Sequence, residues 1–322
     1  MYQPLISIVI VDYKSDNPYL LEAFKAIKKQ TYKNYEIILV TDYKNNLHQT
    51  NLTKKSYGKY VGPAQKRDDG AKIAKGKILA FLDDDAYPDK NWLKEISMEF
   101  CNSSVVAVGG PGVTPPGVSW QEEASGWASA SPLGSGKYLY RFLPSQRQFV
   151  DDYPSMNLSV LRKEFLEVGG FDSTYWPGED TKLCLDLVNK TNKKIIYSPK
   201  ALVYHHRRSI FKPHLKQNGN YGLHRGFFAR VLPQTSLKPF YFAPSSLLIY
   251  LVLLPVLLKT NSLFIFPLYI YLLLLIINSI WILNRSGKLV QSLVSIPVIF
   301  ITHLWYGLRF LQGILFTDKL IQ

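Results

Sequence analysis

Three consecutive carboxylates, Asp83, Asp84 and Asp85, directly follow an apolar run over residues 78–82. A short apolar run is typical of a buried strand, and open α/β sheets bind ligands beyond the carboxyl ends of their strands. Neighbouring acids repel one another, and Mg²⁺ is commonly held by one or two carboxylates together with phosphate oxygens. The triplet therefore predicts a divalent cation holding a diphosphate at a sheet edge. The alternative is a solvated acidic turn.

The residues around the triplet carry a family resemblance. Residues 66–77 are similar to the Arg-Asn-x-Gly-Ala helix of the family 2 glycosyltransferases, with Asp68 in place of the asparagine, and the triplet is similar to that family's Asp-x-Asp motif. The resemblance implies an α/β fold, a doubly wound, Rossmann-like nucleotide-sugar domain of the glycosyltransferase A type. It also implies that Arg67, Asp83 and Asp84 lie on the donor side and that Asp85 holds Mg²⁺ or Mn²⁺.

Further segments follow the order expected for this family. They are the expected strands over 5–11 and 35–40 and the motifs over 154–159, 169–172, 178–180 and 203–205. By resemblance, Asp42 contacts the nucleoside of the donor, although Tyr43 stands where the family often has a second acid. His205 matches the position that often completes the metal shell. The residues expected on the acceptor or lipid side are Asn157, Trp176, Arg207 and Arg208.

Two pairs of residues leave alternatives open. The family's general base sits at the position of the pair Glu179–Asp180, which favours Asp180, with Glu179 second. A single base without a nucleophile implies direct displacement with inversion. The pair could instead only begin a helix, because acids are favourable at a helix N-terminus. His206 stays open beside His205 as the metal ligand, and because successive strand residues face opposite sides, only one of them should point into the site.

The C-terminal part of the chain is almost purely apolar. Apolar stretches cover 240–258, 263–283 and 289–316, and a membrane-spanning helix needs about 20 mainly apolar residues. The first two are expected to span a membrane, and the third either spans or lies in the interface. A buried hairpin of core helices is the alternative. The predicted domains are a catalytic domain over 1–206, a basic-aromatic interfacial segment over 207–241 and a membrane anchor of two or three helices over 242–322.

The net charge of +14 indicates an anionic partner. Anionic lipids attract basic segments beside a membrane, and no nucleic-acid-binding motif is present, so we expect membrane lipids and not nucleic acid. The apolar run near the N-terminus is too short for a signal peptide, and Arg285 and Lys288 make the loop between the second and third stretches basic. These features predict that the catalytic domain lies on the cytoplasmic face, where Cys101 and Cys184 stay reduced.

The predicted function is inverting, metal-dependent transfer of a sugar from a nucleotide-sugar donor, with a UDP-sugar favoured. The expected acceptor is a polyprenyl-linked saccharide or another lipid in cell-envelope glycan synthesis, and the weakly patterned stretch over 112–152 is expected to cover the acceptor side. A nucleotidyltransferase is one alternative, but the glycine-rich phosphate-binding signature expected near its first strand is missing. A non-enzymatic membrane scaffold with a decayed transferase fold is the other. The sequence leaves the oligomeric state open.

Overall fold

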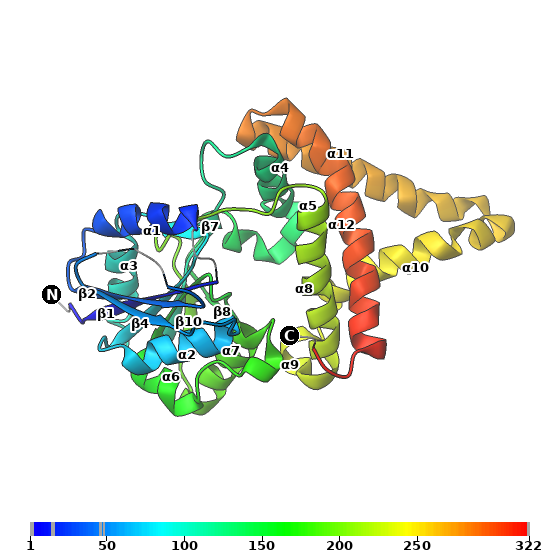
Figure 1. Cartoon of the computed structure of the whole chain (residues 1–322). Coiled ribbons are helices and arrows are strands. Elements are labelled where there is room, and N and C mark those ends of the chain that lie inside the picture. Colours follow the sequence, from blue (N-terminus) through cyan, green and yellow to red (C-terminus); the bar gives the residue numbers. More distant parts are fainter. Residues whose placement is uncertain (1–2, 14–16, 45–46, 48, 321–322) are drawn as a thin grey trace. The chain divides into compact units, whose positions relative to one another are not determined.

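The computed structural model describes residues 3–13, 17–44, 47 and 49–320 and divides the chain into two compact units (Figure 1). The sheet unit consists of Met1–Val113 and Leu143–His206, and the helical unit of Thr114–Phe142 and Arg207–Ile321. Thr114–Phe142 was expected inside the catalytic domain, but it packs with the C-terminal residues.

The sheet unit is built on an eight-stranded mixed sheet with the order β3-β2-β1-β4-β9-β6-β10-β8. Strands β3, β2, β1 and β4 are parallel, whereas β9 runs antiparallel to both of its neighbours. A second sheet has the order β5-β11-β7. The strands are β1 (Ile6–Asp12), β2 (Tyr35–Thr41), β3 (Leu52–Ser56), β4 (Ile78–Asp83), β5 (Ala86–Pro88), β6 (Val105–Gly109), β7 (Gly112–Val113), β8 (Gln148–Val150), β9 (Asn157–Leu161), β10 (Lys194–Tyr197) and β11 (Val203–His205).

Helices cover both faces of the large sheet, with α1 and α3 on one face and α2, α6 and α7 on the other (Figure 1). Helix α1 begins where the Asn17 side chain accepts a hydrogen bond from the Tyr19 N–H, and its buried positions, spaced as on one helix face, pack on the strands. The helices are α1 (Pro18–Lys28), α2 (Pro63–Ile73), α3 (Trp92–Glu99), α6 (Arg162–Val168), η2 (Ser173–Tyr175) and α7 (Glu179–Thr191). The predicted α/β class is therefore confirmed.

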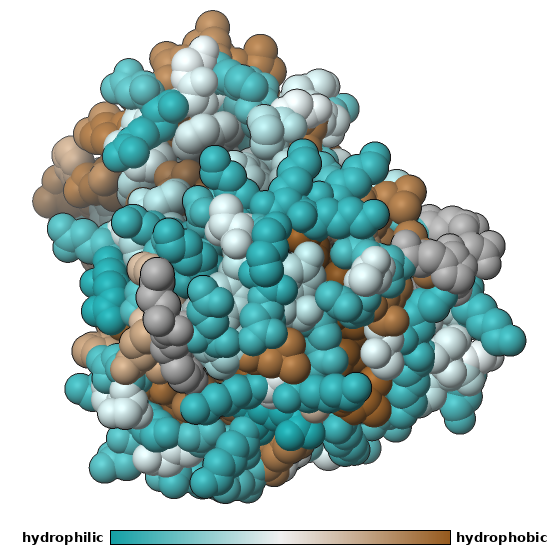
Figure 2. Space-filling model, turned by 90° about the vertical axis from the view of Figure 1, so that its left-hand side faces the viewer, coloured by the Kyte–Doolittle hydropathy of each residue, from teal (hydrophilic) through white to brown (hydrophobic). Residues whose placement is uncertain are grey.

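The helical unit contains three helices long and apolar enough to cross a membrane, over Pro239–Thr260, Ser262–Ser286 and Leu289–Phe316. In each of the first two helices, only 17% of the residues in the most apolar part are buried. A hairpin inside a soluble core would bury most of them, so membrane crossing is favoured. The face of the sheet unit seen in Figure 2 is, by contrast, mainly hydrophilic. The helices of this unit are α4 (Trp120–Ser129), α5 (Pro132–Ser135), η1 (Gly136–Arg141), α8 (Lys212–Val231), α9 (Pro233–Ser236), α10 (Pro239–Thr260), η3 (Ser262–Ile265), α11 (Phe266–Ser286) and α12 (Leu289–Phe316).

Helix α8 packs closely along α12, and glycines make the contact possible (Figure 1). A Cβ atom at Gly222 would lie 2.6 Å from the Tyr306 carbonyl oxygen, and one at Gly226 would lie 2.1 Å from that of Phe310. Small residues let helix backbones approach, as is common between membrane helices. The basic-aromatic segment is therefore largely a helix held against the third apolar stretch.

Asp68 replaces the asparagine that the family pattern places in α2, and it keeps a hydrogen-bonding role. Its Oδ1 accepts a hydrogen bond of 2.8 Å from the Phe171 N–H, which fixes the turn over 169–172. Burial raises the pKa of Asp68 to about 6 from its ordinary 3.8. The folded state therefore favours the protonated carboxyl of Asp68. The stability that this protonated carboxyl contributes is fully present below pH 4 and is lost as the pH rises through 6.

We expect Asp68→Asn to stabilise the protein at pH 7.5, because an amide accepts the same hydrogen bond without a charge. After a discount for partial exposure, the gain is about 1–2 kcal/mol. Thermal unfolding of the full chain in detergent should show the melting temperature of the variant rising above that of the wild type between pH 5 and 7.5. Equal melting temperatures across this range would contradict the assignment.

Candidate active site

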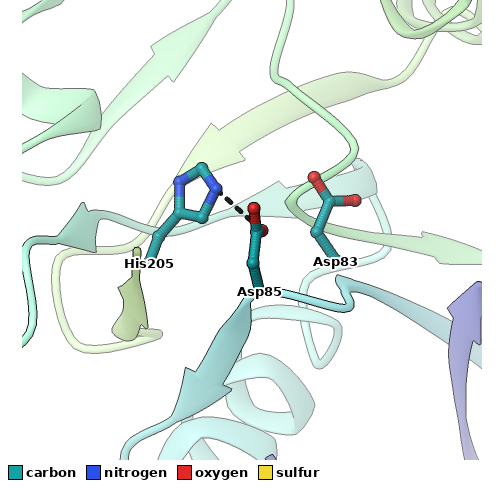
Figure 3. Close-up of side chains that lie close together, drawn as sticks. All are labelled: Asp83, Asp85 and His205. Carbon is teal, nitrogen blue, oxygen red and sulfur yellow. Dashed lines mark ion pairs between the residues drawn. The ribbon is translucent and has the colours of Figure 1, made fainter. Parts of the chain in front are cut away.

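Asp83, Asp85 and His205 meet where β4 ends and the small sheet begins (Figure 3). One potential ligand atom from each lies within 4.8 Å of the others, and His205 Nε2 is 3.1 Å from Asp85 Oδ1. Asp83 is the last residue of β4, Asp85 immediately precedes β5, and His205 ends β11, which pairs with β5. The two carboxylates suit Mg²⁺ or Mn²⁺, whereas an imidazole is typically a ligand of transition metals. This group could hold a metal ion.

His206 is directed elsewhere. Its Nε2 lies 2.9 Å from Glu22 Oε2, and its ring stacks on Tyr19 with 4.2 Å between the ring centroids. His205 and His206 thus face opposite sides, as expected for successive residues at the end of a strand. Of the two histidines that the sequence left open, the geometry brings His205 to the acids.

The site carries more negative charge than its own cations balance. Burial, the hydrogen bond with Asp12 and the charges of Asp85 and Asp83 raise the pKa of Asp84 to about 8. Asn17 Nδ2 donates to Asp84 Oδ2 at 2.9 Å and to Asp12 Oδ1 at 3.2 Å, and so holds both acids in place. A bound divalent cation would relieve this repulsion. Sequence reasoning missed Asp12 and Asn17, although an acid at the end of the first strand was a signal.

Arg67 connects the acidic turn to the start of α7. Its Nη2 donates to Asp83 Oδ1 and its Nη1 to Glu179 Oε1, both at 2.9 Å, and all these groups belong to the sheet unit. Arg67 and Glu179 are buried. Burial and the charge of Asp180 raise the pKa of Glu179 to about 7, against the opposing effect of Arg67. Glu179 is therefore an internal partner of Arg67.

Asp180 is half-buried in the first turn of α7. Its Oδ1 accepts from the Thr181 N–H at 2.7 Å and its Oδ2 from the Ser155 N–H at 3.3 Å. These bonds and the helix N-terminus stabilise the carboxylate. The acid at the start of α7 that was foreseen as an alternative role is therefore present, although the N-cap residue itself is Gly178.

Asp42 has a partner that sequence reasoning missed, the buried Lys66. Asp42 Oδ1 accepts from Lys66 Nζ at 2.9 Å and from the Val61 N–H at 3.0 Å. Among the described residues, the buried Asp42 Oδ2 has no hydrogen-bond partner. A buried acceptor without a partner is costly, so this oxygen is suited to a ligand that brings an N–H group.

The residues expected on the acceptor side have different surroundings. Asn157 is only 1% exposed, accepts from Trp92 Nε1 and donates to the carbonyl oxygens of Gly110 and Ala201. These internal bonds use both ends of the Asn157 amide, and its place on the acceptor side stays a prediction. Trp176 is half-buried just before α7. The Arg207 N–H donates to Glu122 and its guanidinium lies over Phe142, whereas Arg208 is exposed.

Solved structures resemble the fold. The mannosyltransferase PcManGT from Pyrobaculum calidifontis, in complex with GDP-Man and Mn²⁺, matches with a TM-score of 0.56 at 15% identity, over 99% of this chain and 89% of the other. GalNAc-T7 with UDP, GalNAc and Mn²⁺ matches with a TM-score of 0.51 at 20% identity, over 76% of this chain and 53% of the other. The chain therefore has the sheet core of the glycosyltransferase A type.

Sequence comparison finds a domain of a known family in part of the chain. Residues 7–165 match the family model described as Glycosyl transferase family 2, so the chain carries a domain of this family. A stretch of 161 residues is 30% identical to the pre-mycofactocin glycosyltransferase of Mycobacterium tuberculosis, covering 50% of this chain but only a third (33%) of the relative. Another of 225 residues is 24% identical to the glucosyl-dolichyl phosphate glucuronosyltransferase of Haloferax volcanii, covering 62% of this chain and 68% of the relative.

Proposed function

We propose that the protein transfers a sugar from a nucleotide-sugar donor to a lipid-linked acceptor at a membrane, with inversion at the anomeric carbon. The observation that carries this proposal is the grouping of Asp83, Asp85 and His205 within a family 2 domain. The structural relatives were solved with nucleotides or nucleotide sugars and Mn²⁺, and the Haloferax relative is named for a dolichyl phosphate substrate. Candidate membrane spans on the same chain support a lipid acceptor.

In this proposal Asp83, Asp85 and His205 hold Mg²⁺ or Mn²⁺, which when bound neutralises charge on the departing diphosphate. Asp42 Oδ2 accepts an N–H of the nucleobase, and the ion pair with Lys66 keeps that carboxylate in place. Both uracil and guanine offer such an N–H, so UDP-sugars are proposed first and GDP-sugars next. Arg67 fixes the orientation of Asp83 relative to α7.

Asp180 is the proposed general base. The acceptor oxygen forms a bond to the anomeric carbon while the bond from that carbon to the diphosphate oxygen breaks, and the leaving oxygen keeps the electron pair. The proton of the acceptor hydroxyl passes to Asp180. Glu179 remains the second candidate, but its hydrogen bond to Arg67 and its burial favour Asp180 for contact with an acceptor.

The deciding assay uses full-length protein in nanodiscs and a panel of UDP-, GDP- and dTDP-sugars with Mn²⁺ and a polyprenyl phosphate-linked acceptor. Nucleotide release that needs both one donor and the acceptor would support the proposal, and the anomeric configuration of the product would test inversion. Formation of a nucleotide sugar from a nucleoside triphosphate and a sugar phosphate would show a nucleotidyltransferase. Absence of nucleotide binding would favour the scaffold.

We also propose that the sheet unit lies on the cytoplasmic face. If α10, α11 and α12 all span, this places the basic loop between α11 and α12, with Arg285 and Lys288, on the same side.

Cys101 allows a direct test of this orientation, because it is exposed in the sheet unit whereas Cys184 is buried. We expect a membrane-impermeant maleimide to label Cys101 in lysed cells but not in intact cells. A Cys101→Ser variant is the control for specificity. Equal labelling in intact cells would place the sheet unit outside.

A further inference from the structure

Asn17 stands at the start of helix α1 in the sheet unit, and its side chain caps that helix. Its backbone is extended, and its Oδ1 accepts a hydrogen bond from the Tyr19 N–H at 3.1 Å. Asparagine is a common residue at this position, because its side-chain oxygen satisfies one of the first N–H groups of a helix. Capping uses only the oxygen of the amide, so the nitrogen can donate to other partners.

The amide nitrogen of Asn17 contacts acids that follow two neighbouring strands. Strands β1 and β4 are parallel, with Val11 opposite Asp83. Asp12 and Asp84 come directly after these two residues and therefore lie side by side. Asn17 Nδ2 donates to Asp84 Oδ2 at 2.9 Å and to Asp12 Oδ1 at 3.2 Å. A single side chain thus supplies donors to both carboxyl groups.

These bonds reach the acidic turn at its middle residue. Asp84 stands between Asp83, the last residue of β4, and Asp85, which immediately precedes β5. A longer hydrogen bond of 3.4 Å runs from Asn17 Nδ2 to the backbone carbonyl oxygen of Asp84, so Asn17 contacts both the side chain and the main chain of the turn. Asn17 is buried, and all of these residues belong to the sheet unit. The position of Asp84 limits where its two neighbours can place their carboxylates.

We infer that Asn17 is a positioning residue for the metal site, because its amide nitrogen holds Asp84 and so keeps Asp83 and Asp85 in the arrangement that a metal ion needs. The inference rests on the proposed function, since it takes these acids and His205 as the metal site. Residues that orient metal ligands typically change metal affinity by about 10–100-fold when they are mutated. If Asn17 only capped α1, serine could replace it without loss, because serine and asparagine cap helices about equally well.

The test measures Mn²⁺ binding to full-length protein in nanodiscs by electron paramagnetic resonance, without nucleotide. Asn17→Ser keeps an oxygen that can accept from the Tyr19 N–H, but it offers one hydroxyl proton in place of two amide hydrogens and cannot hold both acids. We expect this variant to raise the dissociation constant for Mn²⁺ about tenfold or more. Its melting temperature should stay close to that of the wild type, because the helix remains capped.

Asn91→Ser is the matched control. Asn91 is the N-cap residue of α3 in the same unit, and its side-chain oxygen accepts from Thr31 Oγ1 at 3.1 Å. The same exchange at this position should leave the dissociation constant for Mn²⁺ within about twofold of the wild type. Wild-type affinity in Asn17→Ser, or an equal loss of affinity in Asn91→Ser, would overturn the inference.

Two further variants complete the experiment. Should Asn17→Ser fail to fold, Asn17→Thr also caps with a single hydroxyl and is judged by the same result. Asp85→Ala separates this inference from the proposed function. If the wild type binds no more Mn²⁺ than Asp85→Ala, the proposed metal site fails and the role of Asn17 fails with it. Tight wild-type binding that Asn17→Ser leaves unchanged refutes only the role of Asn17.

Discussion

Asp85→Ala is expected to abolish sugar transfer, with a loss of at least about 10³-fold, because several kcal/mol of charge stabilisation would be lost with the metal. Asp85 provides one of the two carboxylates in the group and lies 3.1 Å from His205 Nε2. Its turn stands at the end of β4, outside the apolar core of the sheet, so the fold should survive. Turnover and Mn²⁺ binding of the purified variant provide the measurement.

A matched control is Asp186→Ala, which removes an acid of the sheet unit that pairs with Lys182 one turn earlier on α7. This variant should keep both Mn²⁺ binding and turnover. Wild-type activity should disappear with a chelator and return with Mn²⁺. Full activity of Asp85→Ala in the presence of chelator would refute the metal assignment.

Asp180→Asn is expected to lower transfer by about 10²–10⁴-fold, the usual contribution of general base catalysis. Asparagine preserves the size of the side chain and can still accept from the Thr181 N–H, but it cannot take the acceptor proton. Donor affinity, measured by calorimetry with the nucleotide sugar, should therefore stay close to that of the wild type. A collapse of donor affinity would show that Asp180 binds the donor.

Glu179→Gln is the informative comparison for Asp180. It weakens the bond to Arg67, which in turn holds Asp83, so it should reduce metal and donor affinity together with turnover. The two variants therefore differ in whether binding or only the chemical step is affected. A loss of turnover in Glu179→Gln with unchanged binding would instead favour Glu179 as the base.

Local patterns in the sequence were sufficient to predict several elements of the fold and the acidic turn after β4. The runs over 5–11, 35–40 and 78–82 became β1, β2 and β4, because a strand buried on both faces is apolar along most of its length. The long apolar stretches became α10, α11 and α12, because a span needs length and low polarity, which are visible without any tertiary contact. The family resemblance added the order of the motifs.

Tertiary structure decided which of the candidate side chains meet. Arg67 and Glu179 are 112 residues apart in the chain. His205 and His206 could be distinguished only by the direction in which each ring points at the end of β11. Asn157 matched a motif but is used inside the sheet unit, and Glu122 had the spacing of a helix cap but bonds to Arg207. Periodicity and polarity describe the surroundings of a residue along its own element. Hydrogen bonds between distant segments depend on how those elements pack, so only the folded chain could show them.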